Sequence, residues 1–254
     1  LLLVTLLLNA CGGGGGGGAG GGAASYTVPS CTDNGTRDTE YLFMGSYGSG
    51  GNGLTRVCAS AAYARNATGD GIKVAVLDTG ITVNGSNAVF HTELDANVAT
   101  FTSGSDLIGT DNVPNDEEGH GSHVAGIIAG ENNGSGYHGV AYDATLYIYK
   151  VLNDSGSSVG NSIASGITKA RGDGVDIMNL SLGDSGTIGS SCNSASSCET
   201  SLGSTLYTEL EASGAAGKIL VWAAGNDGNS SPTVMSGAAI KKKKKKKKTK
   251  KKVA

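Results

Sequence analysis

The sequence predicts an α/β protein of three layers, in which a mostly parallel β-sheet lies between helices. From Gly71 onward, short runs rich in Val and Ile alternate with longer segments whose apolar residues recur at helical spacing. Several short runs are apolar almost throughout, as in strands covered on both faces. Strands that alternate with helices build parallel sheets through crossover connections. Ligands bind such sheets at the carboxyl ends of the strands, so the residues after each run are the first candidates for a site.

Each element of this core is predicted from its own residues. The first strand, 72–77, runs into the turn Asp78-Thr-Gly80, and similar runs predict strands at 145–151, 175–182 and 218–223. Helices are expected after His120, where Val124, Ile127 and Ile128 lie at helical spacing, around Ile163, Ala164, Ile167 and Ala170, and over 202–212. Residues 61–66 are expected to form a short helix that leads toward the first strand.

The amino-terminal end differs in composition from this core. Residues 1–8 are an apolar run too short to span a bilayer, and Asn9-Ala-Cys11 after it resembles the lipobox of a bacterial lipoprotein signal peptide. On this interpretation residues 1–11 are a partial signal peptide, and Cys11 carries a lipid that holds an exported protein at a membrane surface of the cell envelope. The alternative is an unrelated hydrophobic end with a free cysteine.

Composition also divides the rest of the chain. Residues 12–24 contain only Gly and Ala and are expected to form a flexible tether, followed by an irregular, polar extension at 25–60 and a globular domain at 61–240. Eleven of the twelve residues 241–252 are Lys, and removing their charges from the net charge of −3 leaves −14. The acidic body argues against nucleic-acid binding. We interpret 241–254 as an aberrant Lys-rich tail from a frame slip or misassembled gene end; a genuine basic tail would bind anionic lipid or polyanions.

The five cysteines suit an exported protein. If Cys11 carries a lipid, an even number remains in a context where disulfides persist: Cys31, Cys58, Cys192 and Cys198. Cys192 with Cys198 would close a small loop, and Cys31 with Cys58 would hold the segment before the core. The alternative is four unpaired thiols in a reducing compartment. No Cys-x-x-Cys pair occurs, which argues against metal ligation by cysteine.

Two segments supply an acid and a base at predicted element ends. Val74-Ala-Val-Leu-Asp78-Thr-Gly ends the first strand, and Gly119-His120-Gly-Ser-His-Val-Ala-Gly126 opens a helix. A His removes a proton from a hydroxyl effectively when a carboxylate holds its other nitrogen and stabilises its developing charge. Asp78 and His120 form such a pair if the strand end and the helix start face one cleft.

Both segments resemble the motifs of the subtilisin-like serine protease (subtilase, peptidase S8) family, in which the aspartate motif comes first. The resemblance implies a subtilisin-like fold, incomplete at the C-terminus, with Asp78 and His120 catalytic and His123 facing into the fold. Val221-Trp-Ala-Ala-Gly-Asn226 resembles the segment whose Asn side chain donates to the oxyanion. The resemblance also implies that two segments bind substrate, one by strand addition and one as the pocket wall: Ser181, Leu182 and Gly183, and Ala223, Ala224 and Gly225.

Other interpretations of these residues are less specific. Asp-Thr-Gly alone occurs in aspartic proteases and many turns, but here it is part of a longer matching string. The spacing of His120 and His123 permits zinc ligation, yet the sequence offers no His-Glu-x-x-His motif and indicates no third ligand. We therefore expect no catalytic metal and no cofactor for the chemistry; a structural calcium ion is compatible with the family but is not located by the sequence. Ser185, in Gly183-Asp-Ser185-Gly, resembles the nucleophile loop of chymotrypsin-like enzymes, but those are all-β barrels in which His precedes Asp.

The sequence contains no match to the Gly-Thr-Ser-Met-Ala type of motif that carries the nucleophile of the family. Ser236 lies in Val234-Met-Ser236-Gly, which has the wrong residue order and comes too soon after Asn226. In subtilisin, the reference case, removing the nucleophile alone costs roughly a million-fold in turnover. The sequence therefore predicts a serine endopeptidase by family, truncated and inactive or nearly so as written, with exposed apolar surface and an unpaired strand edge. The alternative is a non-catalytic surface lipoprotein that binds peptides or protein partners.

Overall fold

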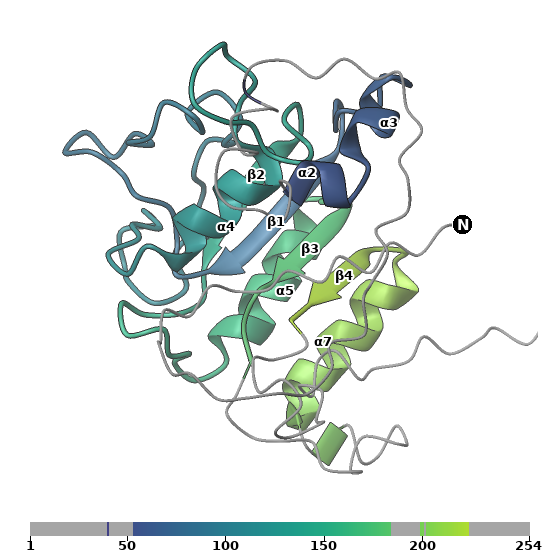
Figure 1. Cartoon of the computed structure of the whole chain (residues 1–254). Helices are drawn as coiled ribbons and strands as arrows, with labels where there is room; N and C mark the ends of the chain where they lie inside the picture. The colour runs from purple at the N-terminus through teal and green to yellow at the C-terminus, as the bar shows by residue number, and fades with distance from the viewer. Residues whose placement is uncertain (1–39, 41–52, 184–198, 201, 224–254) are drawn as a thin grey trace, which may run out of the picture.

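The structure, a computed structural model, describes residues 40, 53–183, 199–200 and 202–223 (Figure 1). In this part of the chain, four strands form one sheet in the order β2-β1-β3-β4. Their bounds are β1 Lys73–Asp78, β2 Thr145–Lys150, β3 Ile177–Leu180 and β4 Ile219–Trp222. Every pairing between them is parallel, so their carboxyl ends meet at one edge of the sheet.

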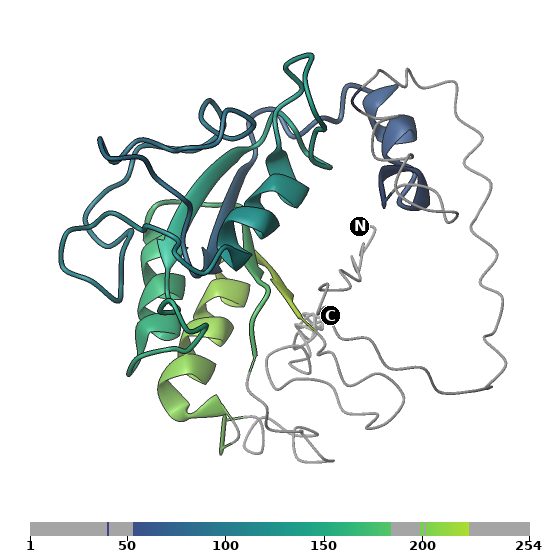
Figure 2. The ribbon, with the colours of Figure 1, turned by 60° about the vertical axis from the view of Figure 1, so that its left-hand side comes forward.

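Helices cover both faces of the sheet. Figure 2 shows α4 (His120–Ala129) on one face and α5 (Ser162–Gly172) with α7 (Ser204–Ala215) on the other. Successive strand side chains point to opposite faces, so Val76 of β1 packs in the cluster that contains α4, whereas Leu77 packs in the cluster that contains α5. The predicted α/β class, with a parallel sheet between helices, is confirmed.

The third strand is shorter than expected. The sequence predicted a strand over 175–182, but β3 covers only Ile177–Leu180. The backbone N–H of Val175 donates to the carbonyl of Ala170 at 3.3 Å, so Val175 belongs to the turn after α5 although its side chain is fully buried. The predicted strand was too long at its start because Val175 is apolar and buried although it lies in a turn.

Two expectations for α4 need correction. The buried side chains of this helix include Val124, as predicted, with Ala125 and Ala129, whereas Ile127 and Ile128 are only half-buried. His123 was expected to face into the fold, but it is exposed. It lies two positions after the buried Gly121, about 200° around the helix axis, and it lines an open surface hollow of about 190 Å³.

The segment before the sheet packs on the loop that leads into β2, where Leu54, Ala59 and Tyr63 form a small apolar cluster with Val140. It contains two short helices, α2 (Gly53–Arg56) and α3 (Ala59–Tyr63), so the helix expected at 61–66 begins and ends earlier. The Tyr63 hydroxyl donates to the carbonyl of Val140 at 2.9 Å. Cys58 is disulfide-bonded to a residue outside the described part, and its pairing with Cys31 stays a prediction.

Candidate active site

Asp78 is the last residue of β1, and its side chain is fully buried at the carboxyl edge of the sheet. One carboxylate oxygen, Oδ1, accepts the backbone N–H of Thr79 at 2.8 Å. The other, Oδ2, is buried and has no hydrogen-bond partner among the described residues. Burial of a carboxylate is costly, and the hydrogen bond to Oδ1 offsets part of that cost.

His120 opens α4 and meets Asp78 directly. Its Nδ1 lies 2.7 Å from Asp78 Oδ1, and its side chain is 35% exposed. An ionised carboxylate can only accept, so Nδ1 carries the proton and Nε2 is left as the acceptor. The arrangement holds one nitrogen of the ring and leaves the imidazole accessible from the surface, which is the geometry a general base requires.

The same contact shifts the titration of the imidazole. The hydrogen bond to Asp78 raises the pKa of His120 above its ordinary value of 6.5, against the opposing effect of burial, and the charges of Asp78, Glu118 and Asp116 raise it further. The pairing therefore favours the protonated imidazolium, which is the state that any general base reaches when it removes a proton.

A close backbone contact joins the two elements that carry the pair. At Gly121, the second residue of α4, a Cβ would lie 2.3 Å from the carbonyl oxygen of Gly80. Gly80 has φ of +118°, and a Cβ there would lie 2.3 Å from the carbonyl oxygen of Pro114. The helix start and the turn after β1 touch through backbone atoms, which only glycine permits.

The sequence did not single out two charged side chains beside this turn. Lys150, at the end of β2, is 6% exposed, and its Nζ donates to the carbonyl of Thr79 at 2.7 Å and to Asp154 at 2.6 Å. Asp116, in the loop before α4, is 4% exposed and accepts hydrogen bonds from both the turn and the helix. Neither residue carries a local sequence signal, because an Asp or Lys near an element end is usually solvated.

The predicted substrate-binding segment begins where β3 ends. Ser181, Leu182 and Gly183 follow Leu180 beyond the paired ladder; Ser181 Oγ accepts from Asn179 Nδ2 at 2.9 Å, and Leu182 is buried. The register that joins Val76 to Asn179 places Ser181 level with Asp78.

Some of the other predicted site residues lie within the described part of the chain, and some lie outside it. Ala223 N–H donates to the carbonyl of Leu180 at 3.0 Å, which places Ala223 at the same edge of the sheet. The remaining candidates lie outside the described residues: Ala224, Gly225, Asn226, Ser185, Ser236, Cys11, Cys31, Cys192 and Cys198.

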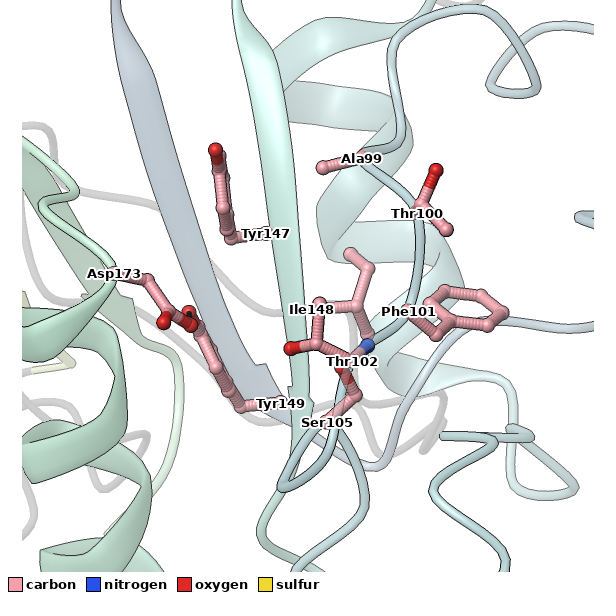
Figure 3. A pocket seen from close by; sticks show the side chains of 9 residues that line it. All are labelled: Ala99, Thr100, Phe101, Thr102, Ser105, Tyr147, Ile148, Tyr149 and Asp173. Atoms are coloured by element: carbon pink, nitrogen blue, oxygen red, sulfur yellow. Dashed lines mark hydrogen bonds between the residues drawn. The ribbon is translucent and has the colours of Figure 1, made fainter.

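A small hollow lies elsewhere, beside the outer edge of β2 (Figure 3). Its volume is about 10 Å³, near the minimum for one water molecule, and its lining includes Tyr147, Tyr149 and Asp173 but neither Asp78 nor His120. The Tyr149 hydroxyl donates to Asp173 at 2.7 Å, and burial raises the pKa of this tyrosine.

Within the described ranges, no group of three or more His, Cys, Asp or Glu side chains is arranged to hold a metal ion. None of the helices described there is long and apolar enough to cross a membrane.

A buried Asp pairs here with a His that follows it in the chain, at the carboxyl edge of a parallel sheet. This order and place are those of the Asp and His in the Asp, His, Ser arrangement of subtilisin-like proteases. Residues 69–249 match the model of the Subtilase family. This match covers more than half of the chain, and the protein belongs to that family.

Curated relatives support the same assignment. Subtilisin Savinase of Lederbergia lenta is 43% identical over 148 residues, which cover 57% of this chain and 51% of the relative. Subtilisin BL of the same organism is 39% identical over 182 residues, covering 70% and 56%. Thermitase of Thermoactinomyces vulgaris is 35% identical over 167 residues, covering 65% and 51%. Among solved structures, Sphericase is 33% identical with a TM-score of 0.48, covering 63% of this chain and 48% of that chain. The chain spans about half the length of these relatives.

Proposed function

We propose that this chain carries the acid and base of a serine endopeptidase that hydrolyses peptide bonds by acyl transfer. The observation that supports the proposal most strongly is the 2.7 Å contact between His120 Nδ1 and the buried Asp78. In this mechanism His120 Nε2 takes the proton of a serine hydroxyl and later gives it to the leaving amine, while Asp78 holds the ring and stabilises the imidazolium. No metal or organic cofactor is needed for these steps.

The proposal assigns the remaining roles by family resemblance. Asn226 donates its side-chain amide to the oxyanion, and the segment from Ser181 to Gly183 pairs with an extended peptide substrate. The position of Ser181 level with Asp78 supports the second assignment, because a peptide bound there would pass beside the acid–base pair. Ala223, with Ala224 and Gly225, forms the wall of the pocket.

The proposal includes the absence of a nucleophile from this polypeptide, since its sequence has no Gly-Thr-Ser-Met-Ala type of motif. Purified chain should not hydrolyse generic peptide substrates, and a serine-directed fluorophosphonate should not label it. Strong labelling that disappears when Ser185 or Ser236 is changed to Ala would show that this part of the proposal is wrong.

A chimera tests the acid–base assignment directly. Residues up to Trp222 are joined to the C-terminal segment of a subtilase that carries a Gly-Thr-Ser-Met-Ala motif, and peptide hydrolysis is measured. In subtilisin, the reference case, loss of the His costs roughly a million-fold in turnover and loss of the Asp roughly ten-thousand-fold, and we expect similar losses for His120→Ala and Asp78→Asn. His123→Ala is the matched control, because His123 is exposed on the same helix and its loss should leave turnover unchanged.

Two outcomes of this experiment count against the proposal. Turnover that survives His120→Ala would remove His120 from the mechanism. A folded chimera that binds peptides but does not cleave them would favour the non-catalytic binding protein.

We also propose that the protein is exported to the bacterial cell envelope and held there by a lipid on Cys11. The lipobox-like Asn9-Ala-Cys11, the Gly-rich tether behind it and the disulfide at Cys58 support this localisation. A reporter fused behind residues 1–24, with a start Met and a basic segment added in front, should incorporate labelled palmitate and enter the membrane fraction. Cys11→Ser should abolish both, and unchanged labelling of that variant would exclude the anchor.

A further inference from the structure

Helix α4 begins without a capping side chain of its own. Its N-cap residue is Gly119, with φ of 99°, a left-handed conformation that glycine adopts without strain. The first N–H groups of a helix have no partner within the helix, and a side chain at the N-cap usually accepts one of them. Because Gly119 has no side chain, these donors must find acceptors elsewhere.

Three residues outside the helix supply the acceptors. Glu118 Oε2 accepts the N–H of His120 at 2.8 Å, and Thr79 Oγ1 accepts the N–H of Gly121 at 2.9 Å. Asp116 Oδ2 accepts the N–H of Ser122 at 2.8 Å. Of these acceptors, Glu118 is exposed, whereas Thr79 and Asp116 are buried under the helix start.

Asp116 is the centre of this arrangement. Its Oδ1 accepts from the Thr79 hydroxyl at 2.8 Å and from the backbone N–H groups of Gly119 and Glu118 at 2.7 and 3.2 Å. Its Oδ2 also accepts from the Ser122 hydroxyl at 2.7 Å. One buried carboxylate therefore binds the loop before α4, the first turn of α4 and the residue that follows Asp78.

The link to the acid–base pair runs through Thr79. The Thr79 hydroxyl donates its proton to Asp116 and accepts from Gly121, while its backbone N–H donates to Asp78. We infer that Asp116 is a positioning residue, which fixes the start of α4 against the end of β1 so that His120 meets Asp78. The inference rests on the proposed acid–base role of that pair, and Asp116 itself makes no hydrogen bond to either side chain.

The position requires a carboxylate and not an amide of the same size. Both oxygens of Asp116 face backbone N–H donors, Gly119 and Glu118 on one side and Ser122 on the other. Asparagine has one acceptor oxygen and one NH₂ group, so in either orientation its NH₂ would oppose at least one backbone N–H. The titration of Asp116 agrees with this requirement: burial alone would raise its pKa, but hydrogen bonds from Ser122, Gly119 and Thr79 outweigh burial and hold the pKa below its usual value of 3.8.

The test measures the His120–Asp78 hydrogen bond by NMR in the whole chain, without reference to catalysis. In Asp116→Asn, we expect the deshielded Nδ1 proton signal to be lost. The pKa of His120 should also fall toward 6.5, but the lost charge of Asp116 contributes to that fall, so the Nδ1 signal is the readout that reports positioning in this variant. Hydrogen exchange at the Ser122 amide should accelerate roughly 5- to 30-fold, the effect of losing a helix cap. Asp111→Asn is the matched control: Asp111 is exposed in the same loop, and asparagine keeps its hydrogen bond to the N–H of Val113.

A second pair of variants keeps the test decisive if Asp116→Asn does not fold. Thr79→Val removes the hydroxyl that joins Asp116 to Gly121, whereas Thr79→Ser keeps it. We expect the pKa of His120 to fall in the Val variant and to be retained in the Ser variant. If His120 keeps its raised pKa and its Nδ1 signal in folded Asp116→Asn, or in Thr79→Val, the positioning role is wrong, while the proposed function of the pair stands. A loss of stability without a change at His120 would likewise reduce Asp116 to a structural residue.

Discussion

Gly121→Ala is the smallest change that should separate His120 from Asp78. The added methyl would lie 2.3 Å from the carbonyl oxygen of Gly80 and 2.8 Å from its nitrogen, whereas ordinary contacts begin at 3.4 Å. Both opposing atoms belong to the backbone, so no side chain can turn away, and the helix start must retreat by roughly 1 Å. Added to the present 2.7 Å, such a movement takes the His120–Asp78 contact out of hydrogen-bond range.

This displacement has two measurable consequences. Overpacking of this kind costs about 1–3 kcal/mol, which urea unfolding of the variant should show as a lower free energy of unfolding. NMR titration should show a pKa of His120 that has moved back toward 6.5, because its largest cause is the hydrogen bond to Asp78. In the chimera described above, a 1 Å misplacement should lower turnover by roughly a hundred-fold.

Gly214→Ala provides the control for helix propensity. Gly214 lies in the last turn of α7, and no heavy atom is within 4 Å of the position of its Cβ. The same substitution there should stabilise the protein by up to about 1 kcal/mol, because alanine favours the helix. If Gly121→Ala behaves like Gly214→Ala and leaves the pKa of His120 unchanged, the close contact between helix and turn does not position the pair.

Three further predictions follow from the contacts. The pairing of His120 with Asp78 should contribute fully to the free energy of unfolding below pH 6.5, and this contribution should be lost as the pH rises through the raised pKa of His120. Urea unfolding at several pH values should show this loss in the natural chain and not in Asp78→Asn. Arg171→Ala should lower the free energy of unfolding by about 1 kcal/mol, and Arg171→Lys by less, because Arg171 binds the Glu209 side chain at 2.6 Å and its carbonyl at 3.3 Å. Ile167→Ala should cost about 2–5 kcal/mol in the same assay, because Ile167 is fully buried between α5 and the sheet; a loss below 1 kcal/mol would contradict its place in the core.

The strands and helices were largely predictable because their signals are local. The run of apolar residues before Asp78 and the spacing of Ala164, Ile167 and Ala170 report directly on burial, and both segments are regular in the structure. The strand order β2-β1-β3-β4 was not predicted, since pairing joins residues far apart in the chain and leaves no local pattern.

The site was predictable only in part, for a related reason. Asp78 and His120 were found because each lies in a long motif at a predicted element end. Asp116 was not, because the loop from Asp111 to Glu118 contains several acidic residues, and only the fold decides which one is turned inward. The prediction that His123 faces into the fold was wrong because the motif shows only which residues are present. Which of them are buried depends on the face of α4 that packs on the sheet.

The acid–base pair is built almost entirely from the end of β1 and the start of α4. Backbone contact at Gly121, the cap from Asp116 and the Thr79 bridge all lie between residues 78 and 122. Lys150, at the end of β2, adds a hydrogen bond to the carbonyl of Thr79. A pair organised in this way should reach its geometry before any nucleophile is present. For this reason, we expect that the chimera will hydrolyse peptides through Asp78 and His120 without redesign of either residue.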